Sequence, residues 1–446
     1  MSTSAERSGR SAPLSEAVIP GLEASSWEEF LSPGNLGRAL RRVEANRGAP
    51  GVDGMTTQEL RGWIRERWAG VREALDAGTY RPSPVRRVVI PKPGGSGERL
   101  LGVPTVLDRL IQQAIAQVLT PIFDPCFSGA SFGFRPGKSA HQAVRVARRA
   151  IEDGHRWVVD VDLDRFFDRV NFDILMARVA RKVTDRRLLK LIRAYLEAGV
   201  MIDGIVRASV EGTPQGSPLS PILSNIMLDD LDRELWRRGH RFVRFADDLR
   251  VFVRSRRAAQ RVLDSVTTVV EQRLKLKVNR DKSSVRHARE ATLLGFGFYF
   301  SRSGVRIRVD PKAVKRLKDR IRELTRRRWS VSMICRMDRL NAFISGWMAY
   351  FHLADLASRL RDLDEWLRSR LRQIRWKEWK RYSAKRRNLR QLGIPDRAAR
   401  EWAASSKGYW RIAGSPVLKR ALPNIHWDDL GLLGLQNTWR RLRTTA

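Results

Sequence analysis

The chain has 446 residues, enough for two or three domains with a sizeable core. Its 85 Lys and Arg residues against 48 Asp and Glu give a net charge of +37, which exceeds what solubility requires and indicates a polyanionic partner. Two isolated cysteines without a Cys/His cluster fit a reducing cytoplasm and argue against structural zinc, and no apolar run is long enough to span a membrane.

The first 155 residues read as a tail followed by helices and one hairpin. Residues 1–25 are polar and Ser-rich, which predicts a disordered tail rather than a signal peptide. The pattern from Trp27 to about Ala77 is helical around a Gly-rich loop. Two short apolar stretches, 85–90 and 99–103, flank a Gly-rich octapeptide and predict a β-hairpin with a mobile tip.

Helical and strand patterns alternate downstream of this hairpin. They predict, in order, a helix over 107–119, a strand over 157–163, mostly helix to about 198, a Pro/Gly/Ser loop over 213–221, a helix from 222 to about 237, strands at 242–243 and 249–253, a helix over 258–274 and a strand over 293–300.

Beyond residue 310 the composition shifts. Residues 311–446 hold 33 basic and 12 acidic side chains, a net of +21, together with nine of the fourteen tryptophans, in a helical pattern without convincing strands. Basic stretches with interleaved Trp residues indicate a surface for structured RNA. A solvated helix face is the alternative, which the shortage of acidic partners disfavours. The aromatic stripe of the helix predicted over 341–351 is expected to pack in the core.

Two adjacent acids mark the candidate chemistry. Asp247 and Asp248, in Phe245-Ala-Asp-Asp, stand at the bend of a strand–turn–strand pattern, where they repel each other unless a cation joins them. An ordinary polar turn is the alternative. Two-metal phosphoryl transfer needs carboxylates from separate strands, and Asp162 at the end of the strand over 157–163 supplies one. Asp160 shares its face by strand alternation. A helix cap or surface charge is the alternative for any single one of these acids.

Five strings in the same order resemble the motifs of the reverse transcriptase–maturases encoded by bacterial group II introns, of the type that lacks an endonuclease. They are 159–168, the Gly-Thr-Pro-Gln-Gly-Ser-Pro-Leu-Ser-Pro string over 212–221, 245–248, 278–282 and 294–296. The resemblance implies an α/β (α+β) right-hand polymerase, with fingers and palm containing an antiparallel sheet, followed by an all-α thumb/maturase domain.

The family's organisation implies the following division of the chain. A disordered tail over 1–25 is followed by an N-terminal extension and fingers over 26–155. A palm with some fingers elements covers 156–305, and a thumb/maturase domain covers 306–390. A basic DNA- or RNA-binding extension over 391–446 comes last. Within the second part, Arg135 and Lys138 match a family string and are expected to contact template or RNA.

The resemblance also implies roles for single residues. Asp162 and Asp247 would be the principal ligands of two Mg²⁺ ions, for which Mn²⁺ can substitute, with Asp248 assisting. Lys282 would be the general acid for the pyrophosphate leaving group; a plain loop residue is the alternative. The nucleotide would be bound by Lys92, Arg99, Phe167, Gln215 and Gly216. Phe167 matches the aromatic gate that leaves no space for a 2′-hydroxyl, and a core phenylalanine is its alternative.

Two features depart from the family's fuller pattern. Phe245 stands where Tyr is usual, which retains the ring and removes the hydroxyl, so activity is expected to survive. No Cys-rich endonuclease follows the basic region, so cleavage of a second DNA strand is not expected.

The implied function is RNA-directed DNA synthesis on structured intron RNA, with a DNA primer or target and dNTPs, coupled to help in splicing. No membrane and no zinc are expected to take part. Three alternatives remain open: a domesticated reverse transcriptase in phage defence or DNA repair, an RNA-binding splicing factor with incidental polymerase activity, and an RNA-dependent RNA polymerase.

Overall fold

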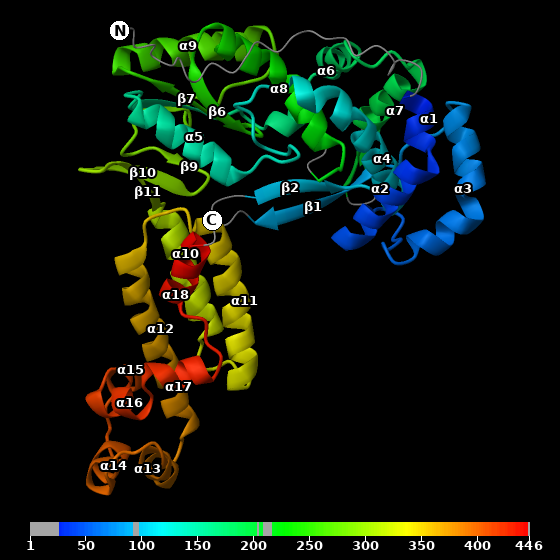
Figure 1. The fold of residues 1–446 in the computed structure, drawn as a ribbon. Helices are drawn as coiled ribbons and strands as arrows, with labels where there is room; N and C mark the ends of the chain where they lie inside the picture. Colours follow the sequence, from blue (N-terminus) through cyan, green and yellow to red (C-terminus); the bar gives the residue numbers. More distant parts are fainter. Residues whose placement is uncertain (1–25, 92–97, 203–204, 208–215, 445–446) are drawn as a thin grey trace, which may run out of the picture. The chain divides into compact units, whose positions relative to one another are not determined.

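The computed structural model describes residues 26–91, 98–202, 205–207 and 216–444 (Figure 1). The expected N-terminal tail and the tip of the predicted hairpin lie outside these ranges. The chain forms two compact units, residues 1–287 and 288–446. The finer division into tail, fingers, palm, thumb and extension stays a prediction. Within the described residues, no helix is both long and apolar enough to cross a membrane.

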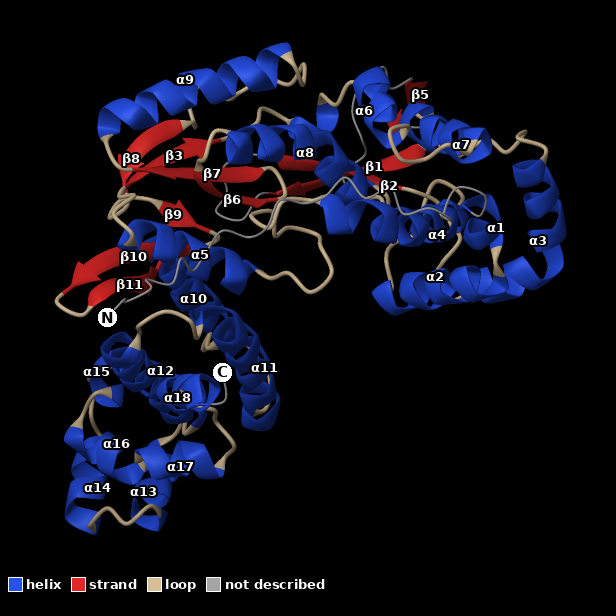
Figure 2. Cartoon of the chain, turned by 45° about the horizontal axis from the view of Figure 1, so that its top comes forward, coloured by secondary structure: helices blue, strands red, loops and turns tan. Residues whose placement is uncertain are grey.

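An antiparallel sheet of order β6-β7-β3-β8 positions the candidate catalytic acids of the first unit. Its strands are β3 (Trp157–Val161), β6 (Arg241–Phe245), β7 (Asp248–Val253) and β8 (Ser284–His287). Figure 2 shows α9 (Arg256–Gln272) lying along this sheet, where it packs on β3, β7 and β8. The helices α5 (Ala140–Glu152) and α8 (Ser220–Arg237) pack on β6. The predicted strand–turn–strand around the two acids is confirmed.

A second sheet of order β2-β1-β4-β5 holds the predicted hairpin. The strands are β1 (Val85–Pro91), β2 (Glu98–Val103), β4 (Val200–Ile202) and β5 (Ile205–Arg207), and the β1–β4 pair is parallel. The other helices of the first unit are α1 (Ser26–Leu31), α2 (Pro33–Asn46), α3 (Leu60–Asp76), α4 (Val106–Phe123), α6 (Phe172–Val179) and α7 (Arg186–Glu197). Thr105 caps α4 by accepting a hydrogen bond from the Asp108 amide at 3.1 Å, which fixes the start of this helix.

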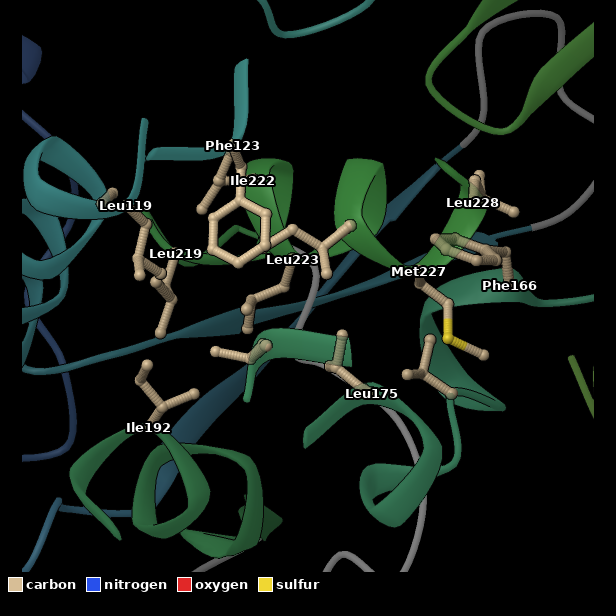
Figure 3. Packing of buried hydrophobic residues seen from close by; sticks show 14 of the residues in the cluster. Leu119, Phe123, Phe166, Leu175, Ile192, Leu219, Ile222, Leu223, Met227 and Leu228 are labelled. Carbon is tan, nitrogen blue, oxygen red and sulfur yellow. The ribbon is translucent and has the colours of Figure 1, made fainter. Parts of the chain in front are cut away.

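One apolar core joins the elements of the first unit. Figure 3 shows side chains from α4, α7 and α8 directed toward one another, among them Phe123, Ile192 and Leu223. Each of these is buried, and removing most of such a side chain costs about 2–5 kcal/mol. This core holds α4 and α8 rigidly in place, and both helices contribute residues to the candidate site.

The second unit is helical after a small sheet of order β11-β10-β9. The strands are β9 (Thr292–Leu293), β10 (Phe296–Ser301) and β11 (Gly304–Val309). The helices are α10 (Pro311–Leu324), α11 (Met333–Phe351), α12 (Ala357–Glu378), α13 (Tyr382–Gln391), α14 (Asp396–Ala403), α15 (Tyr409–Ala413), α16 (Pro416–Ala421), α17 (Asn424–Asp429) and α18 (Leu435–Thr444). The expected order of a mixed α/β region followed by a helical region is therefore confirmed.

Two details of the second unit bear on the sequence predictions. The single strand expected over 293–300 is wrong: Leu294 and Gly295 both have positive φ and break it into β9 and β10. Of the aromatic residues on α11, Phe351 has the expected core role, since it is buried against Phe296 with ring centroids 5.2 Å apart, whereas Phe343, Trp347 and Tyr350 are half-buried.

Candidate active site

The acidic tetrapeptide forms the turn of the β6–β7 hairpin. Phe245 pairs with Asp248, so Ala246 and Asp247 make a two-residue connection. Ala246 has a φ of 58°, in the left-handed region that residues other than glycine rarely adopt. A positive φ at the first central position is the pattern of a type II′ turn, whose twist suits the flanking strands. The acids thus stand on a tight, strained turn rather than on a loose loop.

A buried ionic network holds this turn. Arg244 is 1% exposed and its partner Asp232 is 0% exposed; the guanidinium donates to the two carboxylate oxygens at 2.8 and 2.6 Å. Arg244 also donates to Asn225 Oδ1 and to the backbone carbonyl of Ala246, both at 2.9 Å. Asn225 Nδ2 in turn donates to the carbonyl of Gly133 at 3.0 Å. The network therefore ties the turn to α8 and to the loop that contains Gly133.

Gly133 approaches the turn so closely that only glycine fits there. A Cβ at this position would lie 2.2 Å from the Ala246 amide nitrogen. The expectation that nearby Arg135 contacts template is wrong. Its side chain is buried, lies 2.7 Å from Asp124 Oδ1 and donates to two backbone carbonyls of its own loop. Arg135 shapes the loop that supports the turn.

Asp162 lies beside this hairpin because β3 pairs with β7 up to Val161 and Leu249. The segment of the fourth predicted motif folds against it. The Asn279 amide donates to the Asp162 carbonyl at 2.8 Å, and the Asp162 amide donates to Ser283 Oγ at 3.0 Å. Lys282 Nζ consequently lies 3.8 Å from Asp162 Oδ2. The structure brings together two residues that stand 120 positions apart in the sequence.

Arg250 compensates part of the acidic charge, a role that the sequence did not reveal. It stands opposite Asp160 in the β3–β7 register and is largely buried. Its Nη1 lies 2.6 Å from Asp160 Oδ1 and also contacts Asp248 Oδ1. The alternation of side chains along paired strands is the signal that finds such a residue, but only once the register is known.

The carboxylates lie close enough to affect one another. Burial raises the pKa of Asp160 to about 6; Arg250 opposes this rise, whereas the nearby carboxylates of Asp248 and Asp162 add to it. Burial also raises the pKa of Asp248, again against Arg250 and with Asp162 adding to the rise. Carboxylates that raise one another's pKa are favourable ligands for a cation, which relieves their repulsion.

These residues fit a hard divalent cation of the kind that polymerases use. Among the described residues, no group of three or more His, Cys, Asp or Glu side chains is placed to hold a metal by itself. Mg²⁺ is usually held by one or two carboxylates together with water and substrate phosphates, so a complete protein cage is not required. The carboxylates of Asp162 and Asp247 would be the protein's share of that ligand set.

A cavity of about 710 Å³ in the first unit contains two of the predicted nucleotide-binding residues, Phe167 and Gly216. Phe167 is half-buried, and its ring meets that of the fully buried Phe166 edge to face, with centroids 5.1 Å apart. Of these two adjacent rings, that of Phe167 lines the cavity and that of Phe166 packs in the core. At Gly216 a Cβ would lie 3.0 Å from the carbonyl oxygen of Gly102, and φ is +116°, so glycine is required.

The cavity also has a wall that the sequence did not predict. The helices α2 and α4 supply it, with Arg42, Asn46, Arg109 and Gln113. Arg109 Nε donates to the Pro104 carbonyl at 3.1 Å, and its Nη2 contacts the Ala49 carbonyl. Arg109 thereby holds the Gly-rich loop over 47–54 against the start of α4.

The remaining predicted site residues are less fully placed. Lys92 and Gln215 lie outside the described residues. Arg99 belongs to β2, where its backbone pairs with Ile90, and its side chain is outside the described part. The roles of these three residues stay predictions.

Comparisons with known proteins agree with this geometry. The family described as "Reverse transcriptase (RNA-dependent DNA polymerase)" matches residues 90–298, which include the acidic turn, and the family described as "Group II intron, maturase-specific domain" matches residues 314–393. Protein YkfC of Escherichia coli (strain K12) is 33% identical over 315 residues, which cover 61% of this chain and 82% of YkfC.

Two further similar proteins are matched over a smaller share of their own length. The group II intron-encoded protein LtrA of Lactococcus lactis subsp. cremoris is 28% identical over 343 residues, which cover 62% of this chain and 57% of LtrA. A chain of the solved "Partial Cas6-RT-Cas1--Cas2 complex" is 28% identical, with a TM-score of 0.36, over 55% of this chain and 42% of that one. At that TM-score the likeness does not bear on the fold. The two family matches and the likeness to YkfC show that the chain belongs to the group II intron reverse transcriptase–maturases, a family of RNA-dependent DNA polymerases.

Proposed function

We propose that this protein copies a structured intron RNA into DNA with two Mg²⁺ ions, extends a DNA primer or target with dNTPs, and helps the same RNA to splice. The observation that carries the proposal is the convergence of Asp162, Lys282 and the turn with Asp247 and Asp248 from three separate segments. Mn²⁺ can replace Mg²⁺ at such oxygen ligands. Because the reaction needs nucleotides and DNA, we expect it to take place in the bacterial cytoplasm, near the nucleoid.

Each residue of the site has a part in the reaction. Asp162 and Asp247 would hold Mg²⁺, which would supply activation of the primer 3′-hydroxyl and neutralisation of the triphosphate charge. Asp248 assists by keeping negative charge at the turn, and Arg250 fixes the direction of its carboxylate. Lys282 stands beside Asp162, where a protonated amine donates a proton to the departing pyrophosphate.

The nucleotide side of the site selects its substrate by shape. The ring of Phe167 in the cavity beside Gly216 stacks under the sugar and excludes a 2′-hydroxyl. Lys92 and Arg99 grip the triphosphate, and Gln215 contacts the nucleotide. A primer-extension assay that compares deoxynucleotides with ribonucleotides tests this reading; equal use of the two would favour an RNA-dependent RNA polymerase instead.

One variant separates the two activities of the proposal. Asp247→Ala removes a metal ligand and should abolish cDNA synthesis, while splicing of the bound RNA continues. Asp173→Ala, an exposed acid on α6, is the matched control. Loss of splicing in Asp247→Ala with RNA binding intact would contradict separate roles for the polymerase site and the maturase region.

The RNA partner is identified by sequencing the RNA that co-purifies with the protein. Enrichment of an RNA with group II ribozyme domains supports the proposal. Enrichment of an unrelated RNA from a defence or repair locus would replace the intron role while leaving the polymerase chemistry intact.

A further inference from the structure

The helical unit contains a cavity that the polymerase site does not use. It has a volume of about 400 Å³ and lies between α12 and the stretch from α16 to the start of α17. Its walls are formed by Arg361, Glu365, Arg368, Arg372, Lys419, Pro423 and Asn424. Four of these seven residues are basic and one is acidic, so the cavity is strongly cationic.

Arg372 lies at the buried side of this cavity. It is 4% exposed, and its Nε donates to the Leu422 carbonyl at 3.0 Å. Among the residues that the structure describes, its two terminal nitrogens have no partner. Burial lowers the pKa of Arg372, and the nearby Arg368 lowers it further. These terminal nitrogens are open to the cavity, where an anion can reach them and complete their hydrogen bonds.

Arg368 adds a second buried cation. Its side chain is largely buried, its Nη2 lies 3.6 Å from Asp428 Oδ1, and its Nε has no hydrogen-bond partner within the described part of the chain. Residues 361, 365, 368 and 372 follow one another at helical spacing, so one face of α12 carries three arginines. Glu365 lies between Arg361 and Arg368 on this face and offsets their charge, whereas Arg368 and Arg372, four residues apart, repel each other, and a bound anion would relieve that repulsion.

The rim of the cavity is more exposed than its base. Lys419 Nζ lies 3.5 Å from Glu365 Oε1, so the single acid is already paired. The Arg361 side chain is 74% exposed and reaches solvent. The cavity therefore has two fixed arginines inside and two adjustable basic side chains at its mouth.

We propose that this cavity binds a backbone phosphate of structured RNA, with Arg368 and Arg372 contacting the phosphate oxygens and with Arg361 and Lys419 contacting the flanking backbone. The planar guanidinium with its fork of donors matches phosphate geometry. RNA is favoured as the source because residues 361–372 lie within the match to the maturase-specific domain. The assignment rests on the proposed RNA binding and gives it a definite site.

The test uses the full-length protein and two charge-matched double variants. R361E/K419E reverses the rim charges, and R387E/R397E reverses two exposed arginines on α13 and α14 as the control. Affinity for a fluorescein-labelled RNA hairpin is measured over a series of KCl concentrations. The rim variant should bind about tenfold more weakly than the control, and its slope of log K against log [KCl] should be smaller by about one. Equal losses and equal slopes in the two variants would overturn the proposal.

Additional arms address the buried arginine and the source of the phosphate. Arg372→Gln should weaken hairpin binding like the rim variant, and the rim variant decides the matter if Arg372→Gln does not fold. A DNA hairpin of the same sequence is measured in parallel, and a loss confined to DNA would overturn the RNA assignment. Asp247→Asn should abolish cDNA synthesis without changing hairpin binding, so failure of the polymerase proposal and failure of this site are seen separately.

Discussion

The buried Arg244–Asp232 pair is expected to be the largest single contribution to the stability of the catalytic turn. Replacing one partner leaves the other charge buried and uncompensated, which costs about 3–5 kcal/mol. Both side chains are at most 1% exposed, so water cannot reach the stranded charge. We therefore expect Arg244→Met and Asp232→Leu each to destabilise the first unit by about 3–5 kcal/mol, a large share of the 5–15 kcal/mol typical of a native protein.

The double variant gives the sharper result. Removing both charges together is often neutral in itself, but Arg244→Met also removes the donor to Asn225 and to the Ala246 carbonyl. Leaving such buried groups unsatisfied costs about 1–3 kcal/mol each. The double variant should thus lose about 2–6 kcal/mol, at or below the lower end of the 6–10 kcal/mol sum of the single losses. Because the carbonyl of the turn has lost its donor, cDNA synthesis should remain impaired even though the fold is partly rescued.

Hydrogen exchange of the β6 and β7 amides, followed by mass spectrometry, measures the loss of stability locally. A local measurement is needed because the chain has two units that need not unfold together. Arg241→Met, an exposed arginine on β6 that pairs with Asp153, is the control. A single-variant loss below about 1 kcal/mol, or additivity within about 0.5 kcal/mol, would refute the reasoning.

Three further predictions concern the site and its support. Arg250→Leu removes the charged contact to Asp248 and should lower the single-turnover incorporation rate about 10- to 100-fold with little change in nucleotide affinity; an unchanged rate would contradict a positioning role. Phe167→Ala should reduce the preference for dNTPs over ribonucleotides about tenfold or more in primer extension. An unchanged preference would mean that Phe167 is only a core residue and does not select the sugar. Arg237, together with Arg238, holds the pKa of Glu234 at about 2, so its contribution to stability is present above about pH 4.5 and is lost as pH falls toward 2. Urea unfolding should accordingly show the advantage of wild type over Glu234→Gln shrinking between pH 5 and pH 3, and an advantage that does not change with pH would count against this.

The catalytic hairpin could be predicted from sequence because its signals are local. The apolar stretches on each side of the acids specify β6 and β7, and the two-residue turn follows from their spacing. The contact between Asp162 and Lys282 is long-range, and it was accessible only because both residues lie in strings that resemble family motifs.

Other features depend on packing that the sequence does not encode locally. The role of Arg250 requires the register between β3 and β7, and a shift of one residue would place it on the other face. The sequence does not identify Arg135 as a structural residue, because a buried arginine and a template-binding arginine look alike in sequence. The cationic cavity of the second unit joins α12 to Lys419, which lies more than forty residues downstream, so no local pattern marks it.

Single-nucleotide incorporation on an RNA template tests the central claim most directly. Asp162→Asn and Asp247→Asn each retain the size of the side chain and remove the charge that holds a divalent cation, which is worth several kcal/mol in the transition state. Both variants should lose about a thousandfold or more in rate while binding template and primer normally, and Asp173→Asn should behave as wild type. Incorporation by either site variant at near wild-type rate would contradict the assignment of these two carboxylates as the catalytic metal ligands.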